Sequence, residues 1–259
     1  MTKIAFDAGH GINTPGKRTP DGEREWSFND AVVRAAIARL GAYERVSILR
    51  VDDTSGKTDI PLRSRTNRAN AWKADVYVSV HHNANVGVWG SHGGVETFVN
   101  NHPQANPASQ RIADIIHPRI VKAMGLRDRG VKKANLHVVR ETNMPAILTE
   151  GGFMDSTTDI GALRSAARLK AQGEAITDGL AQYFGLKLKA GNAVTAPSAK
   201  EVDEMAQLLP QTQKDDMRNL LAKAYKNKTF STDHTTKVNT MTRGQALDLL
   251  ISYVARTAK

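Results

Sequence analysis

Short apolar runs, bounded by glycine, proline or charged residues, recur along the first 150 residues of the chain. These runs are rich in valine, isoleucine and phenylalanine, the residue types that fit a pleated, half-buried sheet. Strands of four to eight residues are the usual structure for such runs. The pattern predicts six strands, at residues 3–9, 45–51, 75–82, 93–99, 136–140 and 145–150.

Helical periodicity fills the gaps between these runs. Val33, Ala36, Ile37 and Leu40 recur at the spacing of one helix face, which predicts a helix over 29–40. Further helices are expected at 61–72, 108–124, 159–168 and 170–184, and Pro118 is expected to kink or break the one at 108–124. Alternating strands and helices predict a three-layer α/β/α domain with a mostly parallel six-stranded sheet.

The pattern changes near residue 187. The segment KLKAGNAVTAPSAK is small and polar and contains glycine and proline, as linkers do. Only helical patterns follow it. We therefore expect a first domain at 1–188, a linker at 189–199 and a small all-α domain at 200–259. A domain of roughly 60 residues buries little apolar surface, so forming a homodimer through it would add stability.

Composition removes several classes of protein. The 259 residues contain no cysteine, which excludes disulfide scaffolds, cysteine-ligated zinc, iron–sulfur clusters and a thiol nucleophile. Any metal must therefore bind to histidine and carboxylate. No apolar run approaches the roughly 20 residues that span a bilayer. The N-terminal sequence MTKIAFDAGHG lacks the apolar segment of a secretory signal peptide, so we expect a chain made without one.

The charge balance points to an anionic partner. Lys and Arg total 36 against 26 Asp and Glu, a net charge of +10. This excess suits nucleic acid, anionic lipid or an acidic cell-wall polymer, and charge alone does not choose among them. No run of five basic residues occurs and the phenylalanines do not cluster with basic residues, so we expect no nucleic acid partner. We expect no membrane partner either, because the chain has no apolar run long enough to span a bilayer.

Histidines follow two of the predicted strands. His10 lies in the turn D-A-G-H-G after the first, and His81 and His82 lie in S-V-H-H-N-A at the end of the third. Ligands of open α/β sheets bind beyond the carboxyl ends of the strands. Hydrolytic zinc commonly takes a His/His/Glu set and keeps one position for water. His10 and His81 can supply the imidazoles, and Glu23 and Glu25 are the nearest carboxylates.

A further acid ends the sixth predicted strand. Glu150 stands in L-T-E-G-G-F, where a carboxylate suits a general base for a hydrolytic water. His82 competes with His81 as a ligand, because adjacent strand residues point to opposite faces. Asp7 is a candidate to orient a ligand, and Arg129 is expected to be a solvated loop charge or to hold a substrate carboxylate. On the residues alone, a metal hydrolase and ordinary polar turn residues remain open alternatives.

Six sequence blocks together resemble a known family. Residues 3 to about 186 resemble the zinc-dependent N-acetylmuramoyl-L-alanine amidases of the third amidase class, found among bacterial autolysins and phage endolysins. The resemblance implies that His10, Glu25 and His81 bind Zn²⁺ and that Glu150 is catalytic; Ala8 and His82 depart from the family's usual residues. The blocks are F-D-A-G-H-G at 6–11, E-W-S-F-N at 25–29, L-R-S-R-T-N-R-A-N at 62–70, S-V-H-H-N-A at 79–84, D-R-G-V-K at 128–132 and P-A-I-L-T-E-G-G-F at 145–153.

The last 60 residues are similar to the cell-wall-binding modules of endolysins from phages of Bacillus-like hosts. Blocks such as M-T-R-G-Q-A-L-D-L-L-I-S-Y-V carry the likeness. It implies recognition of an acidic wall polymer of a Gram-positive host. It also implies a protein made in the host cytoplasm that reaches the wall after release through holin pores.

The combined expectation is a peptidoglycan hydrolase of the endolysin type. It would cleave the amide between N-acetylmuramic acid and L-alanine of the stem peptide. Two alternatives stay open: a zinc peptidase that cuts within the stem, and a non-catalytic wall-binding protein with a silent site. A DNA-binding protein is suggested by the charge alone.

Overall fold

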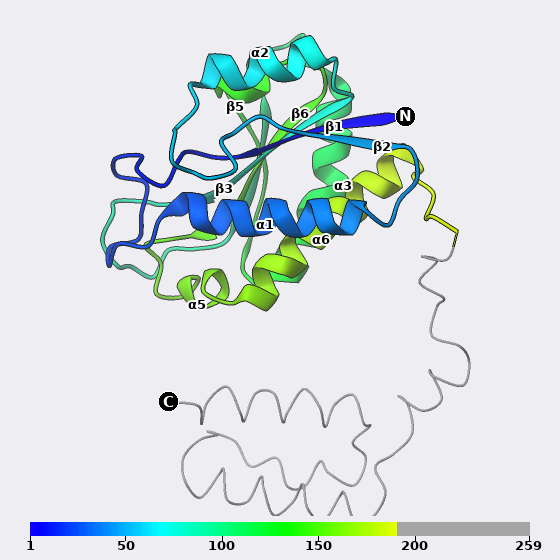
Figure 1. The fold of residues 1–259 in the computed structure, drawn as a ribbon. Helices are drawn as coiled ribbons and strands as arrows, with labels where there is room; N and C mark the ends of the chain where they lie inside the picture. The colour runs from blue at the N-terminus through cyan, green and yellow to red at the C-terminus, as the bar shows by residue number, and fades with distance from the viewer. Residues whose placement is uncertain (191–259) are drawn as a thin grey trace, which may run out of the picture. The chain divides into compact units, whose positions relative to one another are not determined.

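The computed structural model describes residues 1–190 of the chain. The predicted all-α domain at 200–259, and nearly all of the predicted linker at 189–199, lie outside the described residues. Six strands and six helices alternate along the described part (Figure 1). In chain order they are β1 (Thr2–Ala8), α1 (Glu25–Leu40), β2 (Val46–Arg50), α2 (Leu62–Trp72), β3 (Val76–Asn83), β4 (Val95–Asn100), α3 (Pro107–Met124), β5 (Asp128–Ala134), α4 (His137–Arg140), β6 (Ala146–Phe153), α5 (Ile160–Leu163) and α6 (Ala166–Phe184).

The six strands form one sheet in the order β2-β1-β3-β6-β4-β5. All neighbouring pairs are parallel except β4 and β6, which are antiparallel. The carboxyl ends of β1, β3 and β6 therefore meet at one edge of the sheet, together with the start of β4. The mostly parallel sheet predicted from the sequence is confirmed.

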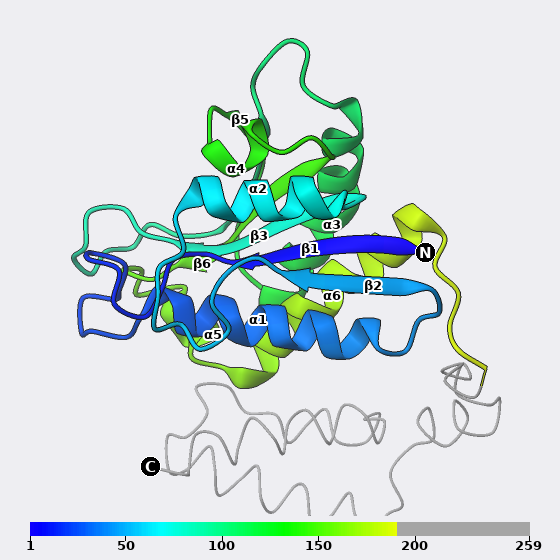
Figure 2. The same ribbon diagram turned by 45° about the horizontal axis from the view of Figure 1, so that its top comes forward.

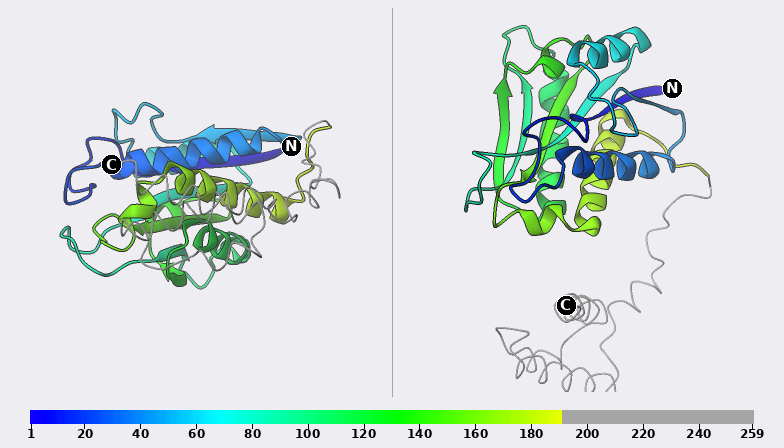
Figure 3. Two further views of the ribbon diagram at one scale, coloured as in Figure 1. Left: turned by 90° about the horizontal axis from the view of Figure 1, so that it is seen from below. Right: turned by 60° about the vertical axis from the view of Figure 1, so that its left-hand side comes forward.

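Helices cover both faces of the sheet, as the alternating pattern predicts. One face packs against α1, α3 and α6, and the left panel of Figure 3 shows these three helices side by side. The other face packs against α2 and α4, seen above the strands in Figure 2. Alternate residues of β1 serve the two layers: Ile4 and Phe6 join the larger core and Ala5 joins the smaller one. The three-layer α/β/α architecture is confirmed.

One predicted strand is wrong. Residues 136–140 form the single helical turn α4, whose Val138 and Val139 are buried against the smaller core. The sixth strand is instead β5, with the polar sequence DRGVKKA. β5 pairs only with β4 and lies at the sheet edge, where a strand needs no continuous apolar run and charged residues protect the exposed side.

Two helix predictions also need correction. α3 is continuous through Pro118, so the alternative that the proline breaks the helix is wrong, whereas the alternative of a kink stays a prediction. Pro118 is exposed, while Ile112, Ile116 and Ile120 are fully buried, so packing of the apolar face holds the helix together across the proline. The break between the last two helices falls at 164–165 and not at 168–170, because Ser165 caps α6 by accepting a hydrogen bond from the backbone N–H of Arg168.

None of the described helices combines the length and the apolar character that crossing a bilayer requires.

Candidate metal centre

The turn after β1 presents His10 at the carboxyl edge of the sheet. His10 has a positive φ of 66°, and its carbonyl oxygen accepts a hydrogen bond from Nη2 of Arg65 at 2.8 Å. Gly9 precedes it, and a Cβ at that position would lie 2.0 Å from Cε1 of His81. Glycine is therefore required for the close approach of the turn to the His81 ring.

Glu25 is the first residue of α1, whereas the sequence predicted that the helix begins at 29 and that Glu25 lies in the preceding loop. The helix starts earlier because the loop before it folds back: Glu25 donates its N–H to Lys17 O at 3.1 Å. The side chain of Glu25 is buried, at the positive end of the helix dipole, which favours its carboxylate form. Glu23, the alternative ligand, is exposed, is paired with Arg164 and is not part of the cluster of donors described below.

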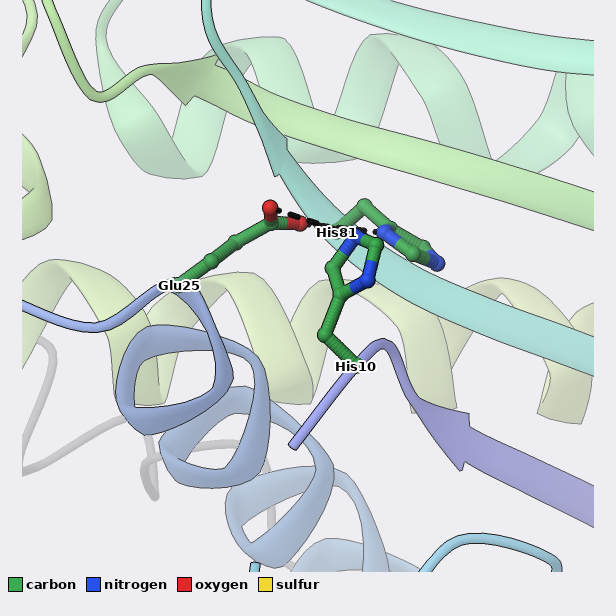
Figure 4. Close-up of side chains that lie close together, drawn as sticks. All are labelled: His10, Glu25 and His81. Carbon is green, nitrogen blue, oxygen red and sulfur yellow. Dashed lines mark hydrogen bonds and ion pairs between the residues drawn. The ribbon is translucent and has the colours of Figure 1, made fainter. Parts of the chain in front are cut away.

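His81 completes a cluster of three donors. His81 Nδ1 lies 3.0 Å from Glu25 Oε1, and His10 Nε2 lies 3.3 Å from Glu25 Oε2. One ligand atom from each residue lies within 4.8 Å of the other two, and the three side chains converge from the turn after β1, from α1 and from β3 (Figure 4). Two imidazoles and a carboxylate are the donor set of many hydrolytic zinc sites, so these residues fit such a metal.

His82 points away from this cluster. Its Nδ1 lies 2.8 Å from Asn29 Oδ1 and its Nε2 lies 3.3 Å from Gln172 Oε1, both in the layer of α1 and α6. His82 is also buried against the ring of Phe28. The structure thus brings His81, and not His82, together with His10 and Glu25.

A buried hydrogen-bond chain supports His81 from below. Nε2 of His81 lies 3.2 Å from Ser79 Oγ, and Ser79 Oγ donates to Asp7 Oδ2 at 2.9 Å. Asp7 also accepts bonds from Tyr77 and Arg65. Burial raises the pKa of Asp7, but the charges of Arg65 and His81 and the hydrogen bonds from Arg65 and Ser79 outweigh it and hold the pKa below 3.8. Asp7 therefore orients His81 indirectly, through Ser79.

Glu150 is the strand partner of His81 across β3 and β6. The two residues line the same cavity, which has a volume of about 410 Å³. Oε2 of Glu150 is buried and has no hydrogen-bond partner among residues 1–190, and burial raises the pKa of this carboxyl to about 8. A carboxyl that is buried, unpaired and able to hold a proton near neutral pH suits general acid–base work.

The protonation states of two of the candidate ligands suit a cation. Burial raises the pKa of Glu25, but the hydrogen bond and charge of His81 outweigh it and bring the pKa to about 2. Burial lowers the pKa of His10 to about 4. Glu25 is therefore a carboxylate and His10 a neutral imidazole at neutral pH, the forms in which these groups bind metals.

Glu96 lies on a strand, as the predicted strand at 93–99 requires, but its contact with Arg129 was not expected from the sequence. Arg129 is not a solvated loop charge: it lies on β5, its Nε donates to Glu96 Oε1, and its guanidinium lies over the Phe153 ring. Glu96 is the strand partner of Glu150 across the antiparallel pair. No sequence signal gives this pairing, because the register of β4 on β6 depends on the whole sheet.

Comparisons with known proteins agree with this geometry. The sequence pattern of the N-acetylmuramoyl-L-alanine amidase family matches residues 4–182. The amidase CwlM of Bacillus licheniformis is 38% identical over 190 residues, 73% of this chain and 72% of that protein. The endolysin of Bacillus phage SPP1 is 32% identical over 197 residues, 74% of this chain and 70% of its own. The solved catalytic domain of CwlV, an N-acetylmuramoyl-L-alanine amidase of Bacillus (Paenibacillus) polymyxa var. colistinus, superposes with a TM-score of 0.65 at 29% identity, over 72% of this chain and all of that domain.

Proposed function

The chain belongs to the N-acetylmuramoyl-L-alanine amidase family, and from this premise we propose that it is a zinc-dependent enzyme in which Glu150 is the general base. Membership makes it a peptidoglycan amidase, a hydrolase that degrades cell wall. The bond cleaved is the amide between the lactyl group of N-acetylmuramic acid and L-alanine of the stem peptide. The metal, its ligands and the role of each residue are the parts that we propose.

One observation carries the proposal. Donor atoms of His10, Glu25 and His81 lie within 4.8 Å of one another, beside a cavity that Glu150 also lines. A buried oxygen of Glu150 without any partner is costly unless a ligand or a reacting group meets it. A bound cation and a substrate would together account for both features.

The residues divide the chemistry between them. His10, Glu25 and His81 would hold Zn²⁺, which supplies Lewis-acid polarisation of the scissile carbonyl and a lowered pKa for water. Glu150 takes the proton of the attacking water and delivers it to the departing amine nitrogen. The new C–O bond forms and the C–N bond breaks, so the products are a muramic-acid carboxylate and a free L-alanine amine.

We also propose the endolysin role, with residues 200–259 as the wall-binding part. The 32% identity to a phage endolysin supports the role, and the net charge of +10 suits an acidic wall polymer. Residues 200–259 lie outside the described part of the chain. Their polymer, a homodimer formed through them and release through holin pores therefore stay predictions.

Digestion of purified Gram-positive peptidoglycan tests the function. The wild type and Glu150→Ala are compared, zinc content is measured on both, and the released ends are identified by mass spectrometry. We expect free L-alanine amino termini with intact glycan strands, lost in a variant that still binds zinc. Cleavage inside the stem would show a zinc peptidase, and zinc-loaded protein without cleavage would show a binding protein with a silent site.

A further inference from the structure

Two basic residues share the cavity beside the metal centre. Lys17 and Arg18, from the loop between β1 and α1, line it together with His81, Glu150 and the residues 83–87 that follow β3. A volume of about 410 Å³ falls at the lower end of the range for ligand sites. The groups that surround the scissile bond would therefore meet Lys17 and Arg18 as well.

The backbone of this loop is fixed against α1. Lys17 O accepts the N–H of Glu25 at 3.1 Å, Arg18 forms an antiparallel bridge with Arg24, and Thr19 N donates to Glu23 O at 2.8 Å. The loop is thus a short hairpin that ends at a proposed metal ligand. Lys17 and Arg18 are held at a set place relative to the reacting centre, which a binding residue requires.

The charges of Lys17 and Arg18 have no direct partner within the described part of the chain, although the Lys17 charge contributes at longer range to the lowered pKa of Glu25. Neither side chain forms an ion pair or a hydrogen bond with any residue among 1–190. The two acids of the same hairpin, Asp21 and Glu23, are instead both bound by Arg164, with 2.6 Å between Arg164 Nε and Glu23 Oε2. Two uncommitted cations therefore remain at the cavity.

We propose that Lys17 and Arg18 bind a free carboxylate on the second or third residue of the stem peptide, and so favour substrates in which that carboxyl is not amidated. This inference rests on the proposed function. The lactyl carboxyl forms the scissile amide and therefore carries no charge. The negative charges closest to that bond are the free carboxylates of the stem peptide. A free carboxylate on the second or third residue would pair with Lys17 and Arg18, whereas an amide at the same position would leave both side chains without an anionic partner.

Soluble muropeptides in matched pairs test the inference. Within each pair only one carboxyl differs, free or amidated, at the second residue in one pair and at the third in the other. The variant Lys17→Met/Arg18→Gln is compared with the control Arg111→Gln/Lys122→Met, which makes the same charge change on exposed positions of α3. For each of these proteins, kcat/KM is measured on every muropeptide. Kd is measured on two inactive proteins that carry Glu150→Gln, one with Lys17 and Arg18 kept and one with both replaced.

We expect the wild type and the control to favour the free carboxylate of one pair by roughly two- to fivefold, the size typical of exposed ion pairs. In the Lys17→Met/Arg18→Gln variant the preference disappears, because kcat/KM falls for the acid and not for the amide. The inference would be overturned if the wild type had the same kcat/KM and Kd for acid and amide in both pairs. It would also be overturned if kcat/KM fell equally for acid and amide in the Lys17→Met/Arg18→Gln variant. Neither result would contradict the amidase activity itself. If the wild type cleaves none of the peptides, the proposed function fails, and the Kd values alone then decide whether the carboxylate site exists.

Discussion

Oγ of Ser79 lies 3.2 Å from Nε2 of His81. The single hydroxyl proton of Ser79 is donated to Asp7 Oδ2, so Ser79 can only accept from His81. His81 therefore donates from Nε2, and its Nδ1 faces Glu25 Oε1, 3.0 Å away, where Nδ1–H donates to the carboxylate as long as no cation is bound. Because the Ser79 contact keeps the proton on Nε2, Nδ1 is the nitrogen that would release its proton and bind a cation.

Ser79→Ala removes the acceptor for Nε2 of His81. We expect zinc affinity to fall by about 10- to 100-fold, the effect typical of losing a partner of a metal-bound histidine. Zinc Kd values from chelator competition provide the measurement. Ser64→Ala, at an exposed position of α2, is the control and should leave the Kd unchanged. An unchanged Kd in Ser79→Ala would show that Ser79 does not set the orientation of His81.

Glu150→Gln separates chemistry from metal binding. The glutamine keeps the shape of the side chain but cannot take a proton, so turnover should fall by about 10²- to 10⁴-fold. Zinc content should remain that of the wild type. Glu44→Gln serves as the matched control, because Glu44 is exposed and lies just before β2, at the amino end of the strands and away from the candidate site. A variant that loses zinc as well would make Glu150 a ligand and not a base.

The sequence predicts the layers of this fold better than the details of the sheet. Apolar runs such as Tyr77–Val80 belong to strands buried on both faces, and buried strands leave a strong pattern. β5 has neighbours on one side only, so its sequence is polar and it escaped prediction. The antiparallel insertion of β4 is likewise a property of the whole sheet, which no local pattern records.

The sequence identifies the residues of the candidate site but not the contacts that hold their side chains in place. His10, His81 and Glu150 all stand at or just after the ends of the strands predicted from the sequence, and His10 and Glu150 also stand beside glycines, so all three are visible as candidates. The sequence suggests Asp7 as a support for a ligand, but spacing alone does not reveal the contact between Ser79 and His81. Arg129 was misplaced because its strand was missed, and its bond with Glu96 depends on the pairing of β4 with β5.

Removal of zinc should reduce both activity and thermal stability. A ligand present at about 100 times its Kd adds roughly 2.7 kcal/mol to the free energy of unfolding. For a domain of this size that corresponds to a Tm increase of about 5–10 °C. Chelation should lower the Tm by this amount and zinc should restore it. His10→Ala should show neither change in scanning calorimetry, and a zinc-dependent Tm in that variant would place the metal elsewhere.

Asp155 anchors the loop after β3 that lines the cavity. Its buried carboxylate accepts the N–H groups of Asn85, Val86 and Gly87 and lies 2.7 Å from Nε2 of His92. Asp155→Asn should cost about 1–3 kcal/mol of unfolding free energy, because an amide presents a donor where only acceptors fit. Faster amide hydrogen exchange at residues 85–87 and a raised KM should accompany the loss.

The contacts of the Asp155 carboxylate also predict how the stability of the protein depends on pH. Burial raises the pKa of Asp155, but the His92 bond and the backbone N–H groups outweigh it and hold the pKa below 3.8. A lowered pKa in the folded state gives stability that is present above the unfolded value and lost as pH falls through the folded one. The stability gap between the wild type and Asp155→Asn should persist at neutral pH and narrow below about pH 4 in urea titrations. A gap that is constant with pH would mean that the charge of Asp155 contributes nothing.

Arg65 joins the two loops on the other side of His10. Its buried guanidinium donates to Asp7, to the carbonyl oxygens of Ala8 and His10, to Asp59 Oδ1 and to the carbonyl oxygen of Ile60. Lysine keeps the positive charge but cannot reproduce this fork of donors.

Arg65→Lys should therefore lower the unfolding free energy by about 2–4 kcal/mol. It should also weaken zinc binding, because the His10 turn loses its 2.8 Å bond. Arg68→Lys is the matched control on the same helix: Arg68 is exposed and makes one side-chain hydrogen bond, to Val51 O, so the change should cost less than about 1 kcal/mol. Urea denaturation and zinc competition on both variants measure the two effects. If Arg65→Lys and Arg68→Lys lose the same unfolding free energy, a lysine ammonium satisfies the buried acceptors as well as the guanidinium does. The fork geometry of Arg65 is then not needed to hold the turn.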